Sequence, residues 1–220
     1  MRRPVVLAVA AVLLSAWPAA AQARKGSWEI APGAIWFSGA DLGGSEATLE
    51  RPDGGEFVLF RTDTRLEGAF APAVTLSVYL APRLAVEAGF SYARPEASTR
   101  VTDDAEGAEP VTSTIGLQQY LIEGNLRWYL ARPRAGWRPF LRAGGGYLRQ
   151  LDDSNAHVET GRTGQAGLGL DRAFRDRAAG RVRRVGLRLD ARVLARSGGF
   201  DVEDTLRIGF SAGALLFVGF

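Results

Sequence analysis

The sequence contains eight stretches in which apolar residues alternate with polar or small residues at a period of two. In Val182–Ala195, for example, Leu187 and Leu189 share one parity, and Arg188 and Asp190 share the other. Because successive side chains of a β-strand point to opposite faces, this pattern predicts strands with one apolar face. The eight predicted strands are Trp28–Phe37, Leu66–Leu80, Leu84–Ala93, Thr114–Leu130, Pro139–Gln150, Thr163–Arg172, Val182–Ala195 and Thr205–Phe220.

The segments between these strands alternate in length, most clearly in the first half of the chain. A long loop over Ser38–Arg65 is followed by the tight turn Ala81-Pro82-Arg83, and then by a long acidic loop over Arg94–Ser113. Short turns on one side and long loops on the other are typical of up-and-down membrane barrels. The pattern therefore predicts an all-β protein, an eight-stranded antiparallel up-and-down transmembrane β-barrel with both chain ends on the short-turn side.

Alternation alone does not say which strand face points into the barrel, because a soluble lipocalin-like barrel has its apolar face inside. The face opposite the apolar one is rich in small residues in this chain, as at Gly144, Gly146, Gly167 and Gly169. Small residues fit the narrow interior of a small barrel, whereas an exterior surface has no need of them. The sequence therefore favours an apolar face toward lipid. The alternative is a soluble periplasmic ligand-binding barrel.

The charged residues of the predicted inner face balance one another, with five acids and five arginines. Since an unpaired charge in a low-dielectric interior is costly, this balance indicates ion pairs in the bore. The opposing interpretation is that solvent-exposed strands also carry balanced charge. Because a barrel of this size is just wide enough to be filled by its own side chains, we expect a plugged interior. The predicted lumenal ion-pair network comprises Glu29, Glu87, Glu123, Arg127, Arg142, Asp171, Arg188, Asp190, Arg192 and Arg207.

Large aromatic residues gather near the ends of the predicted strands. Aromatic rings prefer the headgroup boundary of a bilayer, so two such groups predict the interfacial girdles of a membrane barrel. One group comprises Trp28, Trp128 and Phe220, with Trp137 on the adjoining turn, and the other comprises Trp36, Phe70, Tyr92 and Tyr147.

The first residues have the pattern of an export signal. Arg2 and Arg3 precede the unbroken apolar run Val5–Leu14, and Ala21-Gln22-Ala23 matches a cleavage site. The alternative is an uncleaved anchor, but the apolar run is shorter than the ~20 residues of a spanning helix, and Pro18 interrupts the uncharged segment after it. We therefore expect a signal peptide over residues 1–23 and one β-barrel domain over residues 24–220, located in the bacterial outer membrane.

Charge and cysteine content exclude several functions. Without Arg2 and Arg3 the chain keeps 25 of its 27 basic residues, against 24 acidic ones. This near-neutral balance gives no support for a nucleic-acid partner. The chain has no cysteine, which excludes disulfides and an acylated lipoprotein.

The end of the chain carries a resemblance to a known family. Leu216 and Val218 alternate up to the terminal aromatic Phe220, which resembles the C-terminal signature of bacterial outer-membrane barrels. The segments Pro139–Tyr147 and Leu187–Arg192 also resemble small barrels of the OmpA/OmpX type. The resemblance is one of pattern, over the whole chain after residue 23. It implies that Phe220 is read by the barrel-assembly machinery, and that the barrel contacts outer-membrane lipid and lipopolysaccharide.

An enzymatic role finds little support in the sequence. Barrels that deacylate lipid A have a histidine with a serine two residues later, but His157 is the only histidine here and is followed at that distance by Glu159. No set of Cys and His residues fits zinc, and no Gly-rich segment fits a phosphate-binding loop. We therefore expect no catalytic residue, no cofactor and no metal site, with a lipid A-modifying enzyme as the alternative.

Six arginines cluster around one predicted short turn. Such a cluster suits contact with anionic headgroups or cell wall, although a solvated basic turn is commoner. The expected function is a non-enzymatic outer-membrane barrel with a structural, surface-interaction or narrow-pore role, and the sequence identifies no external ligand. The cluster consists of Arg172, Arg175, Arg177, Arg181, Arg183 and Arg184.

Overall fold

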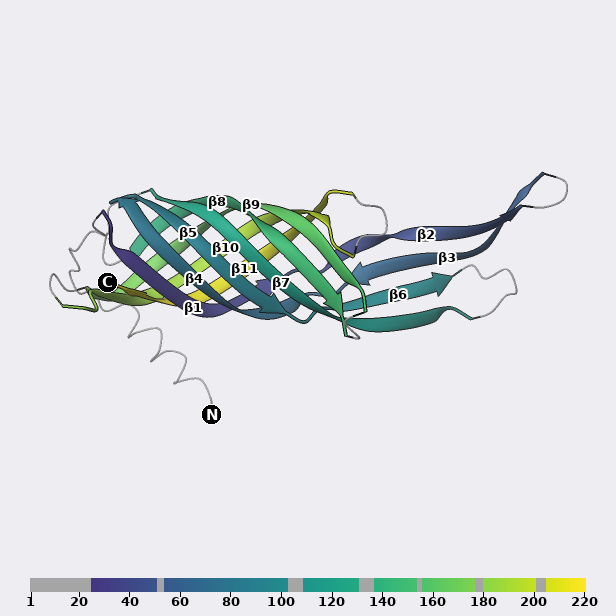
Figure 1. Ribbon diagram of the computed structural model, residues 1–220, viewed down its shortest axis with the longest axis horizontal. Coiled ribbons are helices and arrows are strands. Elements are labelled where there is room, and N and C mark those ends of the chain that lie inside the picture. The colour runs from purple at the N-terminus through teal and green to yellow at the C-terminus, as the bar shows by residue number, and fades with distance from the viewer. Residues whose placement is uncertain are drawn as a thin grey trace, which may run out of the picture.

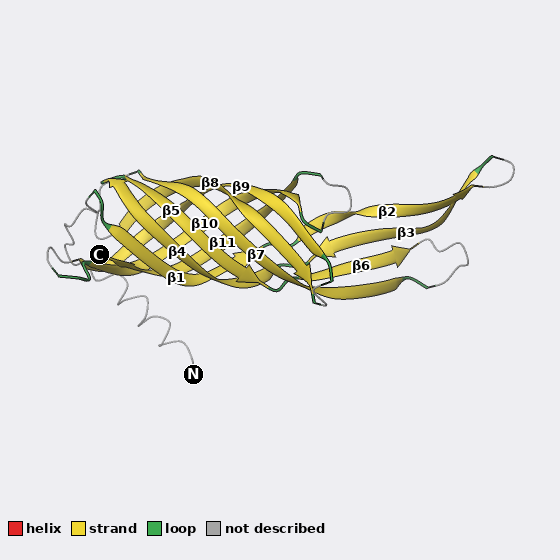
Figure 2. Ribbon diagram, viewed as in Figure 1, coloured by secondary structure: helices red, strands yellow, loops and turns green. Residues whose placement is uncertain are grey.

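The computed structural model describes residues 25–50, 54–102, 109–130, 137–153, 156–176, 180–200 and 205–220. The predicted signal peptide, residues 1–23, lies outside this described part. All regular elements among the described residues are β-strands (Figure 2). These residues include no helix that is long and apolar enough to cross a membrane.

Eight of the strands form a closed antiparallel ring (Figure 1). Pairing of β7 with β8 closes it, so the wall of the ring has no free strand edge. Such closure is the condition for crossing a membrane with strands. Each predicted strand corresponds to one ring strand, which confirms the predicted fold. The ring strands are β1 (Trp28–Phe37), β4 (Ala69–Ala81), β5 (Leu84–Ala93), β7 (Val111–Tyr129), β8 (Trp137–Asp152), β9 (Val158–Asp176), β10 (Arg184–Gly198) and β11 (Arg207–Gly219).

Both chain ends of the barrel lie at one end of the ring, which we call the terminal end. Glu29 near the start of β1 is opposite Gly219 at the end of β11. The tight turn between β4 and β5 lies at the terminal end, as the sequence predicts. The opposite end, which we call the loop end, carries the long connections from β1 to β4 and from β5 to β7 (Figure 1).

The two long connections, which were predicted as loops, contain strands of their own. β2 (Ala40–Glu50), β3 (Glu56–Leu66) and β6 (Glu96–Thr102) join the start of β7 in a sheet of order β2-β3-β6-β7, which projects beyond the barrel (Figure 1). We call it the extension sheet. Its strands lack a sustained alternation of apolar and polar residues: β2 is rich in Gly and acidic residues, and Thr62–Arg65 of β3 alternates threonine with charged residues. A sheet outside the lipid needs no apolar face, so its strands lack the pattern used to find the others.

The apolar face of the ring strands points outward. Leu168, Leu189 and Val193 are 63%, 42% and 46% exposed, whereas Arg188 and Arg192 are 1% and 2% exposed. A soluble barrel with an apolar interior requires the reverse. A continuous apolar band of this kind needs an apolar medium around it, which is the hydrocarbon core of a membrane.

Candidate functional site

The bore of the barrel is the candidate functional site, because most residues of the predicted lumenal ion-pair network lie in it. Nine of the ten predicted network residues are buried there, each less than 9% exposed, and they come from six different ring strands. They are Glu29 on β1, Glu87 on β5, Glu123 and Arg127 on β7, Arg142 on β8, Asp171 on β9, and Arg188, Asp190 and Arg192 on β10.

Arg207 is not part of this group. It is half-buried at the start of β11, opposite Arg196 and four residues beyond Ser211, which lies opposite Arg192. Four residues of strand span roughly 13 Å, so Arg207 lies beyond the ionic layer, toward the loop end. The structure therefore places Arg207 apart from the other nine predicted network residues. Parity alone placed it inside, and parity carries no information on depth along the bore.

The ion pairs nearer the terminal end centre on two arginines. Arg127 pairs with Glu29 at 3.2 Å and with Glu87 at 3.0 Å. Arg188 pairs with Asp171 at 2.9 Å, with Glu87 at 3.2 Å and also with Glu29. Three carboxylates therefore share two guanidinium groups in a region with almost no solvent exposure.

A second group of ion pairs lies adjacent along the bore. Arg192 pairs with Asp190 at 2.6 Å and with Glu123 at 3.0 Å, and Arg142 pairs with Glu123 at 2.9 Å. A longer contact of 3.8 Å from Arg142 to Glu87 joins the two groups. The result is one connected layer of fixed charges, in which each carboxylate has at least one cationic partner.

An aromatic layer fills the bore at the terminal end, and the sequence analysis missed it. The hydroxyl groups of Tyr79 and Tyr129 are 3.0 Å apart, and Tyr129 donates a hydrogen bond of 2.6 Å to Asp171. Phe140 packs edge-on against Tyr129 with ring centroids 5.9 Å apart. These side chains share the strand parity of the buried charges, for example Phe140 with Arg142. Parity was therefore the signal that could have found them.

Two glycines make room for this layer. A Cβ atom on Gly169 would overlap the ring of Phe140, and one on Gly186 would overlap the ring of Phe217, which is also buried. The small inward residues predicted from the sequence are thus present, but they lie beside large aromatic rings that occupy the same narrow bore.

Two further arginines are buried in the bore at its terminal end. Arg138 stacks over Tyr129, with its guanidinium carbon 3.7 Å from the ring centroid, and donates a hydrogen bond of 2.9 Å to the carbonyl of Pro82. Arg184 donates a hydrogen bond of 3.3 Å to the Tyr79 hydroxyl. The predicted balance of five acids and five arginines is therefore not the balance observed. Arg138 directly precedes the predicted strand Pro139–Gln150, and Arg184 was assigned to the arginine cluster around a predicted short turn.

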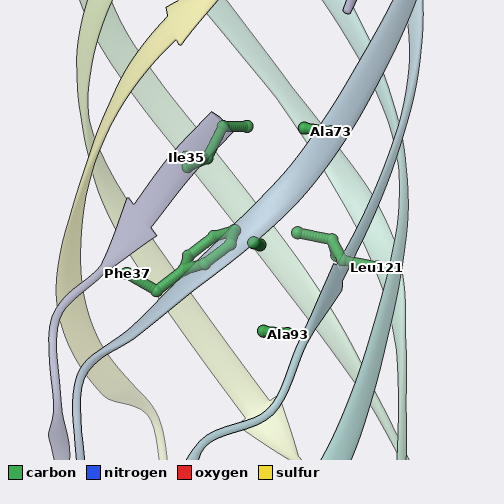
Figure 3. Packing of buried hydrophobic residues seen from close by; sticks show 6 residues of the cluster. Ile35, Phe37, Ala73, Ala93 and Leu121 are labelled. Carbon is green, nitrogen blue, oxygen red and sulfur yellow. The ribbon is translucent and has the colours of Figure 1, made fainter. Parts of the chain in front are cut away.

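An apolar layer closes the other side of the ionic layer. Ile35, Phe37 and Leu121 converge from β1 and β7 on Ala73 and Ala93 inside the barrel (Figure 3). Beyond this layer, at the loop end, lies a cavity of about 60 Å³. Aromatic, ionic and apolar layers thus follow one another along the bore.

The ring carries aromatic residues on its outside as well. Trp28 and Trp128 are exposed near the terminal end, and Trp36, Phe70 and Tyr147 are exposed near the loop end. Tyr92 is half-buried and contacts Tyr120, with ring centroids 5.0 Å apart. Phe220 stacks on Trp28 with ring centroids 4.1 Å apart, and its backbone N–H donates to the Trp28 carbonyl.

The histidine considered in the sequence lies away from the buried carboxylates of the bore. His157 and Glu159 are both exposed at the loop end. No group of three or more His, Cys, Asp or Glu residues among the described ones is arranged to hold a metal ion. The buried carboxylates are instead held by arginines.

The arrangement is similar to that of known barrels in three dimensions, but not in sequence. The chain is similar to the crystal structure of the outer membrane protein OprG from Pseudomonas aeruginosa, with a TM-score of 0.50 and 12% identity over 90% of this chain and 97% of that one. It is also similar to the N-terminal β-barrel domain of Pseudomonas aeruginosa OprF, with a TM-score of 0.41 and 13% identity over 89% and 98% of the two chains. The β domain of the Bordetella autotransporter BrkA gives a TM-score of 0.34 and 12% identity over 90% and 98%.

No family model and no curated protein matches the sequence. The likeness to OprG agrees with the closed ring and the outward apolar band. The fold is that of a small outer-membrane β-barrel.

Proposed function

We propose that this protein is a non-enzymatic barrel of the bacterial outer membrane, with a structural and surface-contact role and no open channel. The observation that carries the proposal is the filled bore inside an apolar outer wall. The charged side chains of the bore come from six strands and form ion pairs with one another. The layers on both sides of these ion pairs are apolar or aromatic.

The filled bore argues against the narrow-pore role. A permeating ion needs sites that it can enter and leave, whereas these arginines and carboxylates are paired at 2.6–3.2 Å and less than 9% exposed. Opening a path would separate several buried pairs at once, at a cost of about 3–5 kcal/mol for each broken pair. Purified protein in a planar bilayer is therefore expected to give no large steady conductance, and such a conductance would refute the proposal.

The extension sheet supports a role in surface contact. The edge strand β2 has two register irregularities and carries Asp41, Glu46 and Glu50, features that discourage strand addition. The opposite edge of the sheet, Val111–Ile115 of β7, carries no charge and is exposed, with Val111 at 62% and Ile115 at 53%. An uncharged, β-branched edge of this kind is suited to pairing with another extended chain.

The proposed orientation places the terminal end toward the periplasm and the extension sheet outside the cell. Trypsin added to intact cells should then cleave at exposed Arg61, Arg65 and Arg100 and leave the buried arginines of the bore intact. Membrane fractionation with a heat-modifiability gel tests the location independently, because a closed barrel migrates differently when it is not boiled. Recovery in the osmotic-shock fraction without detergent would contradict it.

The remaining parts of the proposal concern partners and chemistry. Phe220 would be read by the barrel-assembly machinery, and the outer wall would contact membrane lipid and lipopolysaccharide. Mass analysis of lipid A from cells with and without the protein is expected to give the same spectrum. A changed acylation pattern would favour an enzyme instead.

A further inference from the structure

Two arginines lie side by side on the outer wall of the barrel near the loop end. Arg149 on β8 and Arg162 on β9 are both exposed. Arg162 lies opposite Tyr147 and Arg149 lies opposite Thr160, so the two arginines occupy diagonal positions of one strand pair. The Cβ atoms of such diagonal neighbours are about 7–8 Å apart, which lets both guanidinium groups reach one ligand.

The strand positions next to these two arginines on the outer wall are uncharged. Glu159 adjoins Thr160 in the sequence, but it lies opposite Gln150 and so has the other strand parity. Neither arginine forms an ion pair or a hydrogen bond with the described residues. Their guanidinium donors are therefore open to a ligand. The outer-wall neighbours across the strands and two residues along them are Tyr120, Tyr147, Leu151, Thr160, Gly164 and Ser197.

Tyrosines border the two arginines at the depth of the aromatic girdle near the loop end. Tyr120 lies opposite Arg149 and contacts Tyr92, with ring centroids 5.0 Å apart. Arg94 donates a hydrogen bond of 2.8 Å from its Nε to the Tyr92 hydroxyl. Tyrosine rings favour the headgroup boundary, and arginine side chains near a membrane end extend their charge into the headgroup region. The arginines therefore lie at the level of the lipid phosphates.

The wall has no side chains at three adjacent positions below the arginines, toward the terminal end. Gly124, Gly145 and Gly164 lie opposite one another on β7, β8 and β9. They have the strand parity of Ile122, which is exposed on the outer wall. A Cβ atom on Gly124 or Gly164 would meet no atom within 4 Å, so packing inside the fold does not require glycine there. An acyl chain can lie directly against the backbone at this row.

We propose that Arg149 and Arg162 bind the phosphate groups of lipopolysaccharide, the anionic lipid of the outer leaflet. This inference deepens the proposed contact with lipopolysaccharide and rests on the proposed orientation, which places the loop end at that leaflet. Guanidinium is suited to the role because it stays charged and offers paired donors that match phosphate oxygens. Tyr120 and Tyr147 would contact the glycolipid head, and an acyl chain would follow the glycine row below.

Lipid A with and without its phosphates tests the site directly. The full chain, folded in a nonionic detergent, is titrated with bisphosphorylated lipid A, and native mass spectrometry measures the fraction of protein that retains it. The reference ligand is the same glycolipid after removal of both phosphates. A basic residue at an anionic lipid surface favours binding by about fivefold, so two arginines predict a preference of about 25-fold for the phosphorylated form.

The double variant Arg149→Gln with Arg162→Gln should lose most of this preference. The matched control is Arg83→Gln with Arg175→Gln, which removes the same charge from two exposed positions near the terminal end. The control is expected to keep the wild-type preference. Arg162→Gln alone should lower the preference by about fivefold, and it serves as a second variant if the double variant folds poorly.

Three outcomes would overturn the inference: equal retention of the two glycolipids, an equal loss in the control, or displacement of lipid A by phosphatidylglycerol or inorganic phosphate at the same concentration. The last outcome would indicate a general anion surface instead of a lipopolysaccharide site. Heat modifiability is measured on every sample. A chain that shows no folded band contradicts the membrane-barrel proposal itself, whereas a folded band without preference for the phosphorylated lipid contradicts only the site at Arg149 and Arg162.

Discussion

Replacing Arg188 by methionine removes a cation that three buried carboxylates share. Its Nε lies 2.9 Å from Asp171 and its Nη1 lies 3.2 Å from Glu87, and it also pairs with Glu29. Arg127 still pairs with Glu29 and Glu87 in the variant, whereas Asp171 loses the guanidinium group that lies 2.9 Å from it. Removing one partner of a buried pair leaves an uncompensated charge, which costs about 3–5 kcal/mol.

Urea unfolding of the refolded barrel in detergent micelles, followed by tryptophan fluorescence, measures this cost. With an m-value of about 1–3 kcal/mol per M, the midpoint of Arg188→Met should fall by at least about 1 M. The matched control is Arg61→Met, which breaks the exposed pair with Glu46, whose side chains are 52% and 51% exposed. Exposed pairs contribute about 0–1 kcal/mol, so the control should shift the midpoint by a few tenths of that amount.

The companion substitution Asp171→Asn separates charge from packing. In the Arg188→Met background it removes the carboxylate that lost its partner, so the double variant should be more stable than Arg188→Met alone. Equal midpoints for Arg188→Met and Arg61→Met would refute the reasoning, since the bore would then be wet enough to screen its charges. Failure of Asp171→Asn to restore stability would assign the loss to packing.

Three further predictions concern the other layers and the chain end. Gly169→Val should destabilise the barrel by about 1–3 kcal/mol, because the new side chain overlaps the ring of Phe140. The midpoint of urea unfolding measures this loss, and an unchanged midpoint would mean that the ring moves aside. Phe140→Ala opens the aromatic layer at the terminal end but leaves the ion pairs and the apolar layer in place, so single-channel conductance should stay at the wild-type baseline; a raised conductance would mean that the aromatic layer is what seals the bore. Phe220→Ala removes the 4.1 Å stack on Trp28 and should cost about 0.5–1.5 kcal/mol in refolding experiments, while lowering the yield of folded barrel in cells more strongly; equal effects in both assays would argue against an assembly role.

Removing one partner of a buried ion pair in the bore is costly, although the intact pairs contribute little net stability to the fold. A buried ion pair is often no more stabilising than apolar residues of the same volume, because desolvation offsets its Coulomb energy. In this barrel the network joins side chains from six ring strands, so a slip of one strand by one residue would bring charges out to lipid. Fixing the register is therefore a physical role that the network can serve whether or not it adds to stability.

The sequence by itself determined the wall of the barrel. Lipid imposes a period of two on every strand that crosses it, and that period is visible in Val182–Ala195 without any knowledge of neighbours. Parity then assigned Arg188, Asp190 and Arg192 to one face, and the structure places all of them in the bore. The tight turn at Pro82 is equally local, because proline and strand length are read from adjacent residues.

Only the tertiary structure decided the order of the layers along the bore and the strand pairing of the extension sheet. The pairing of carboxylates with arginines depends on the register and shear of the strands around the closed ring. Glu29, for example, pairs with Arg188, which is 159 residues away in the sequence. The position of Arg207 beyond the ionic layer depends on depth, which parity does not encode. The extension sheet is held together by pairing of β2, β3, β6 and the start of β7, and their sequences lack the apolar alternation of the ring strands. Alternation of apolar residues depends on the medium around a strand, so it can be recognised in the sequence. Strand pairing depends on neighbours that are distant in the sequence, so it becomes visible only in the folded chain.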